Sequence, residues 1–184
     1  TPIVTFDDLR KAKVWTWEEA PLARAIFKEA GVAGIPLSIP DVLVGLQTGL
    51  VDVVYAPPAG AISLQWFTKI KYITDVPLIY LAGAIVLKKD FLNRMPKAFQ
   101  DALTESFSAY MVKLKEVVRT ENREALKVMA KHGVKIVKPS KEQTEEFKRV
   151  SKNAIRQPGS RKFSDDVLNR ISGYLDTYRR MQKE

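Results

Sequence analysis

Residues 41–58 read DVLVGLQTGLVDVVYAPP, and this stretch decides the fold of the chain. Its first half carries three apolar side chains at helical spacing: Val42, Leu43 and Leu46. Gly49 is the residue type that most often ends a helix, and residues 50–55 are rich in the branched and aromatic side chains of a buried strand. A helix that leads through one glycine into a strand is typical of open α/β proteins, which bind ligands at the ends of their strands.

The composition excludes several classes of function. The chain has 184 residues, no cysteine and a single histidine, His132. It therefore lacks disulfides and thiolate metal sites, and one histidine leaves little for a zinc centre or a catalytic triad. The glycines do not have the spacing of a phosphate-binding loop. We expect a protein that is not an enzyme and that uses no cofactor and no metal.

The net charge of +9 has two interpretations. A basic surface attracts nucleic acid or an anionic membrane, but more often it is only a solvated surface. Lysine and arginine are mixed with glutamate through the second half of the chain, without the aromatic and basic platform typical of single-strand binding. We therefore expect no nucleic-acid partner.

Four short apolar segments predict the sheet. They are rich in β-forming residues and lie near residues 12–17, 35–39, 50–55 and 81–87. Because an amphipathic helix separates the first two segments, we expect a three-layer α/β lobe with a mostly parallel sheet.

Residues 96–132 predict one very long helix. Apolar residues recur there at three-and-four spacing, Pro96 fits the first turn, and His132 with Gly133 fits the end. At 1.5 Å per residue this helix is roughly 54 Å long, more than one small lobe can bury. We expect it to span two lobes or to pack on a second copy in a homodimer; two helices with a break near Glu121 remain an alternative.

The segments on either side of that helix complete the expected organisation. Residues 1–95 form the α/β ligand-binding lobe, residues 96–132 the spanning helix, and residues 133–184 a strand and helices that pack back on the lobes. Ser140 and Gln143 predict a capping box at the start of one of these last helices.

Seven residues of the opening stretch also carry a family resemblance: Val42, Leu46, Gln47, Gly49, Val51, Asp52 and Pro57. In this register the stretch resembles the solute-binding receptors of tripartite ATP-independent periplasmic (TRAP) transporters, of the DctP type. Further blocks match in order, including residues 70–73 and the Gly-Val-Lys-Ile-Val-Lys-Pro run at 133–139. The resemblance extends from Thr1 to about Phe147.

The resemblance implies a fold, a function and a location. It implies a periplasmic-binding-protein-like lobe that captures a small-molecule ligand and delivers it to TRAP membrane permease subunits. It also implies a periplasmic protein, exported by a signal segment that is not present in this chain. Receptors of this family begin with another α/β lobe upstream of the position of Thr1, so we expect this chain to correspond to their C-terminal part.

The ligand positions implied by the resemblance carry unusual residues. Trp15 stands where the family usually has the arginine that pairs with a ligand carboxylate. Tyr55 and Ala56 replace the Glu and Asn of a Glu-Asn-Pro motif, and Leu81 replaces a later asparagine. We therefore expect an apolar or amphipathic solute in a cleft lined by Trp15, Trp17, Tyr55 and Leu81, with Ala56 and Asp52 as further ligand-binding positions.

Alternatives remain for the site and for the function. Asp52 could instead bond a neighbouring backbone, as carboxylates at strand ends often do. The ligand could be an organic acid that is held by Lys13, by Arg24 or by the missing lobe. A nucleic-acid- or ligand-binding module outside transport, and a hydrolase of small esters, are the rival classes.

Overall fold

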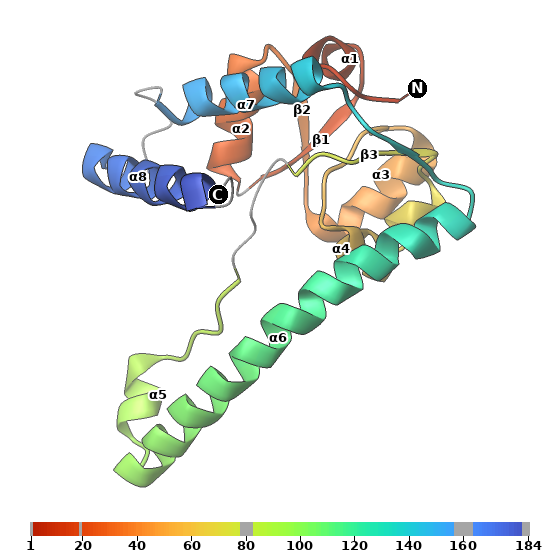
Figure 1. The fold of residues 1–184 in the computed structure, drawn as a ribbon. Helices are drawn as coiled ribbons and strands as arrows, with labels where there is room; N and C mark the ends of the chain where they lie inside the picture. The colour runs from red at the N-terminus through yellow and green to blue at the C-terminus, as the bar shows by residue number, and fades with distance from the viewer. Residues whose placement is uncertain (1, 19, 78–82, 157–163, 182–184) are drawn as a thin grey trace.

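The structure, a computed structural model, describes residues 2–18, 20–77, 83–156 and 164–181. Most elements gather in one α/β body, and the long helix α6 (Lys97–Lys131) projects from it as an arm with α5 (Lys89–Asn93) at its far end (Figure 1). The predicted class, an α/β fold with parallel strands and one long helix, is confirmed.

The first sheet forms the centre of the body. Strands β1 (Val14–Trp17) and β2 (Gly34–Leu37) pair in parallel, with Val14 opposite Gly34 and Trp17 opposite Leu37. Helix α2 (Pro21–Glu29) connects them, and its proline occupies the first turn, where a missing N–H costs nothing. One isolated parallel bridge, from Val14 to Val53, adds residues 50–55 as the rudiment of a third strand.

The predicted single sheet of four strands was wrong. A second parallel sheet pairs β3 (Tyr72–Thr74) with β4 (Lys135–Val137), and these two strands lie on opposite sides of α6 in the chain. Residues 83–87 of the predicted fourth strand carry no strand and are exposed, while residues 81–82 lie outside the described residues. Apolar composition alone could not distinguish a buried strand from this extended connection to α5.

The stretch 41–58 folds as predicted in its first half. The short 3-10 turn η1 (Ile39–Asp41) leads into α3 (Val42–Thr48), which ends at Gly49 with φ of 70°, the left-handed region that favours glycine. Helix α4 (Pro58–Ser63) and the turn η2 (Trp66–Thr68) follow. This region surrounds a core of four buried side chains: Trp15, Val42, Val51 and Trp66.

A second core lies on the other side of β1. Helix α1 (Phe6–Arg10) begins with a capping box between Thr5 and Asp8, and Phe6 packs on Phe147 with ring centroids 4.7 Å apart. Phe147 belongs to α7 (Lys141–Arg156), which packs against α2. The capping box predicted at Ser140 and Gln143 is present at the start of α7.

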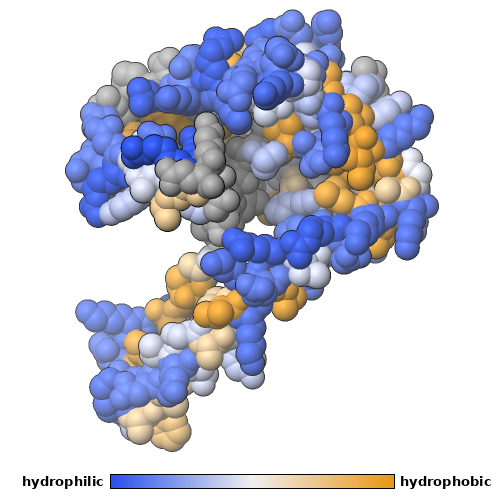
Figure 2. Space-filling view, in the orientation of Figure 1, coloured by the Kyte–Doolittle hydropathy of each residue, from blue (hydrophilic) through white to orange (hydrophobic). Residues whose placement is uncertain are grey.

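Helix α6 is continuous over 35 residues, so the alternative of a break near Glu121 was wrong. Only Ala125 and Met129, near its C-terminal end, are buried, and they pack against α4 and Val134. Figure 2 shows hydrophobic surface along the arm. The exposed apolar residues of α6 include Phe99, Val112 and Val117. Helix α8 (Asp165–Met181) is amphipathic, and the structure buries none of its residues.

Candidate functional site

The two edges of the first sheet carry different residues. Because β1, β2 and the bridging segment run in the same direction, their carboxyl ends meet at one edge and their amino ends at the other. Trp17 and Tyr55 lie at the carboxyl edge, whereas Lys13 and Asp52 lie at the amino edge. Open α/β proteins bind ligands at the carboxyl edge, so the predicted residues there form the candidate site.

The hydrogen-bond ladder stops at this carboxyl edge. Val53 N donates to Lys13 O at 3.2 Å, and Trp15 N donates to Val53 O at 2.8 Å. In a continued parallel ladder Trp17 N would donate to the main-chain oxygen of Tyr55. It donates instead to the side-chain hydroxyl of Tyr55, at 3.3 Å. The third strand therefore separates from β1 here, and the side chain of Tyr55 replaces its own backbone as the acceptor.

Trp15 lies in the core behind this edge. It is only 3% exposed, and its indole Nε1 donates to Leu37 O at 3.0 Å. One ring face meets Tyr55 at a centroid distance of 4.9 Å, and the ring of Trp66 lies edge-on at 5.2 Å. With its polar atom satisfied and its rings covered, Trp15 supports the edge from within the body.

Trp17 is the aromatic residue that reaches the surface at this edge. It ends β1 and is 38% exposed, and Ala56, directly after Tyr55, is exposed as well. The half-buried Tyr55 ring lies between Trp15 and Phe27. The Phe27 ring lies edge-on to the Tyr55 ring, with 5.9 Å between the centroids. The structure thus brings Trp17, Tyr55 and Ala56 together; Leu81 lies outside the described residues.

Asp52 lies at the opposite edge of the sheet. Its Oδ1 accepts the backbone N–H of Lys13 at 2.8 Å, and its own N–H donates back to Lys13 O at 3.0 Å. The ammonium of Lys13 donates to Gly49 O at 2.8 Å. Through these contacts Asp52 and Lys13 align the third segment with β1.

The start of α2 adds polarity near the carboxyl edge. Ala20, its N-cap, has no side chain that can bond the first-turn N–H groups, and the first turn holds no acidic residue. The exposed Arg24 lies in the second turn, and the exposed Glu18 follows Trp17 directly. One cation and one anion on the described residues therefore flank the edge, and their charges offset each other.

Sequence reasoning missed one feature of β1. Thr16 is 4% exposed, and its hydroxyl has no hydrogen-bond partner among the described residues. Its methyl and Cβ lie so close to Gly34 that a Cβ at that position would come within 2.9 Å. The glycine at the start of β2 is the only sequence signal of this close approach.

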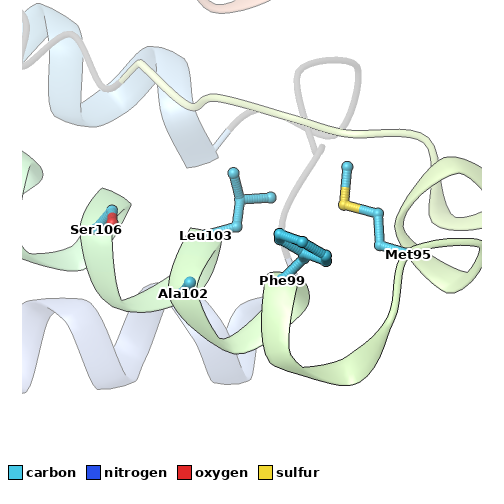
Figure 3. Close-up of a pocket in the computed structure, with 5 residues that line it drawn as sticks. All are labelled: Met95, Phe99, Ala102, Leu103 and Ser106. Atoms are coloured by element: carbon cyan, nitrogen blue, oxygen red, sulfur yellow. The ribbon is translucent and has the colours of Figure 1, made fainter.

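A separate hollow lies at the far end of the arm. It has a volume of about 370 Å³ and is lined by five residues: Met95, Phe99, Ala102, Leu103 and Ser106. Met95, Phe99 and Leu103 point to the same side of the α5–α6 corner (Figure 3). Of the residues predicted for the site, those that the structure describes do not line it.

The described part of the chain offers neither a metal-binding cluster nor a membrane-spanning helix. No group of three or more potential metal-ligating side chains occurs there. Within the same residues, no helix combines the length and the apolarity that crossing a bilayer requires.

Comparison with known proteins decides the family. The sequence model of DctP, described as bacterial extracellular solute-binding protein, family 7, matches residues 1–162. The chain belongs to this family. The resemblance seen in the opening stretch is therefore confirmed.

Individual proteins resemble this chain in sequence or in fold. The chain is 25% identical over 136 residues to the 2,3-diketo-L-gulonate-binding periplasmic protein YiaO of Escherichia coli, which covers 74% of this chain and 41% of that protein. A TRAP periplasmic solute-binding protein from Desulfovibrio salexigens with bound orotic acid has a TM-score of 0.79 at 17% identity, covering 97% of this chain and 57% of that one.

A third relative shows the same fold. DctP7 of Bordetella pertussis, an extracytoplasmic receptor binding pyroglutamic acid, has a TM-score of 0.77 at 18% identity over 97% of this chain and 57% of its own. The chain thus spans about half the length of the relatives that it matches.

Proposed function

We propose that this chain forms one wall of the solute cleft in an extracytoplasmic receptor, which captures a small molecule and delivers it to the membrane permease subunits of a TRAP-type transporter. The observation that carries the proposal is the carboxyl edge of the first sheet. There the ladder stops, and an exposed Trp17 lies beside the hydroxyl of Tyr55, in a chain that belongs to a solute-binding family. The family description names binding and no catalysis, which supports a receptor rather than a hydrolase.

The proposed wall consists of Trp17, Tyr55 and Ala56. Trp15 acts indirectly, because its buried ring fixes the position of Tyr55. An aromatic surface of this kind suits a solute with an apolar, flat body, since such a body gains contact with the Trp17 ring. We therefore retain an amphipathic solute as the first choice.

An organic acid is the second candidate. Three relatives favour an organic acid, because their names give 2,3-diketo-L-gulonate, orotic acid and pyroglutamic acid as the molecules that they bind. In this chain the uncapped first turn of α2 and the nearby Arg24 offer positive potential for an acid group. An acid would then contact α2, and a neutral solute would contact the Tyr55 hydroxyl.

Delivery requires a change in the shape of the receptor. A solute that contacts two lobes favours the closed form by its extra contacts in that form, and the permease would recognise this closed surface. The long helix α6 would connect the lobes, and its exposed apolar side would be covered by the other lobe or by a second copy. Light scattering across a concentration series distinguishes a homodimer from a monomer.

Native mass spectrometry tests the receptor function. The protein is purified without added ligand, and we expect a small molecule to remain bound one-to-one and to leave on denaturation. Trp17→Ala should lose it, while Leu50→Ala, an exposed apolar residue at the amino edge, should keep it. Turnover of ester substrates that follows the purified protein would contradict the proposal.

A further inference from the structure

The hydroxyl of Tyr55 has one hydrogen-bonding capacity left. It accepts the N–H of Trp17 at 3.3 Å, and a phenolic hydroxyl can accept and donate at the same time. Among the described residues, its proton has no acceptor. The hydroxyl, whose bond to Trp17 is exposed, therefore offers a donor to a molecule that occupies the proposed ligand-binding edge.

The direction of this donor is fixed by the packing of the Tyr55 ring. Trp15 lies against the ring at 4.9 Å with 30° between the planes, and Phe27 lies edge-on at 5.9 Å. Trp15 is itself held by its bond to Leu37 O. The ring can therefore move little, and its hydroxyl stays at the place where β1 and the third segment separate. Such preorganisation favours selective binding, because little freedom is lost when the solute binds.

The charge around this donor favours a neutral acceptor. A buried carboxylate needs a cationic partner, and a phenol is neutral. The exposed side chains of Glu18 and Arg24 near this edge offset each other in charge, and Lys13 is engaged at the opposite edge with Gly49, so the described side chains place no excess positive charge beside the donor. A carbonyl oxygen accepts one hydrogen bond from a neutral donor without this cost.

We propose that the Tyr55 hydroxyl selects the solute by donating a hydrogen bond to an uncharged carbonyl oxygen, while the flat body of the solute packs against Trp17. The inference rests on the proposed function and names its solute class: a planar, uncharged molecule that carries a carbonyl group. The donated bond also strengthens Tyr55 as an acceptor, because hydrogen bonds in a chain polarise one another. Binding should therefore tighten the bond from Trp17 N–H to the phenolic oxygen.

Uracil is a suitable probe, because it is flat and uncharged and carries carbonyl groups; succinate is the comparison, because it offers carboxylates and no ring. Each is titrated into the ¹⁵N-labelled protein, Tyr55→Phe and the control Tyr110→Phe, which removes an exposed hydroxyl on α6. We expect uracil to shift the Trp17 amide proton downfield. We expect Tyr55→Phe to bind uracil about three- to tenfold more weakly, and Tyr110→Phe to bind it normally. Circular dichroism checks that both variants are folded.

Three results would overturn the inference. Equal binding of uracil by the wild type and Tyr55→Phe would show that the hydroxyl is not the donor. Binding of succinate without binding of uracil would contradict the neutral class and leave the receptor function in place. If neither compound binds, the proposed solute class, a planar uncharged molecule with a carbonyl group, is wrong. The receptor function is tested separately, by whether native mass spectrometry finds a bound solute.

Discussion

The indole ring of Trp15 lies against the phenol ring of Tyr55, with centroids 4.9 Å apart and 30° between the planes. These are two of the positions at which the family resemblance implied polar ligand contacts. In this chain they contact each other instead, and Trp15 is buried while Tyr55 presents its hydroxyl at the edge. The pair links the core to the proposed site, because the packing of one ring determines the position of the other.

Replacement of Trp15 should affect stability first. Trp15→Ala removes a fully packed ring and leaves a cavity, so we expect the free energy of unfolding in urea to fall by about 3–5 kcal/mol. Trp17→Ala at the exposed end of the same strand should cost less than about 1 kcal/mol. Equal losses for the two variants would contradict the assignment of one to the core and the other to the surface.

Asp52 should act through backbone alignment. Asp52→Ala removes the acceptor for Lys13 N, and we expect a loss of about 1 kcal/mol in chemical denaturation. Asp52→Asn keeps an acceptor oxygen at that place and should recover most of the loss. If Asp52→Ala abolished solute binding at unchanged stability, Asp52 would be a ligand contact instead.

Removal of the unpaired hydroxyl in β1 should stabilise the protein. Thr16→Val keeps the shape beside Gly34 and replaces a buried oxygen without a described partner. We expect a gain of about 1 kcal/mol in the free energy of unfolding, since no buried polar atom remains to be desolvated. A loss of similar size would indicate that the hydroxyl has a partner, such as an ordered water.

The first helix should make stability depend on pH. The backbone N–H of Val4 and the hydroxyl of Thr5 donate to the Asp8 carboxylate and lower its pKa below the ordinary value. Because the folded pKa is the lower one, this stabilisation is present above the unfolded pKa near 3.8 and is lost as pH falls through the folded pKa. The urea midpoint of Asp8→Asn should therefore differ from that of the wild type at pH 6 and approach it in acid. A constant difference across this range would contradict the role of the carboxylate.

Local patterns in the sequence predicted much of the fold. Helix α6 was recognisable because its spacing, Pro96 and Gly133 all agree, and α3 because it ends at Gly49. The pairing of β3 with β4 could not be recognised from the sequence, because each strand has only three residues and α6 separates the two strands in the chain. Such pairing depends on tertiary packing, which no local pattern encodes.

The sequence alone could not show which residues of the proposed site reach the surface. The sequence singled out Trp15, Trp17 and Tyr55, but alternation along a strand buried on both faces does not show which side chain reaches the surface. The sequence could not predict that Trp17 N–H donates to the hydroxyl of Tyr55 and not to its carbonyl oxygen. This bond depends on where the third segment separates from β1 in three dimensions.

The most direct test of the account is the affinity of the co-purified solute, measured by calorimetry on Trp17→Ala and Leu50→Ala. Trp17 ends β1 at the carboxyl edge, whereas Leu50 follows Gly49, whose carbonyl oxygen accepts from Lys13 before the amino end of β1. We predict at least a tenfold loss of affinity in Trp17→Ala, since a central aromatic contact is typically worth about 2 kcal/mol, and unchanged affinity in Leu50→Ala. Unchanged affinity in Trp17→Ala, or an equal loss in both variants, would contradict a solute site at the carboxyl edge.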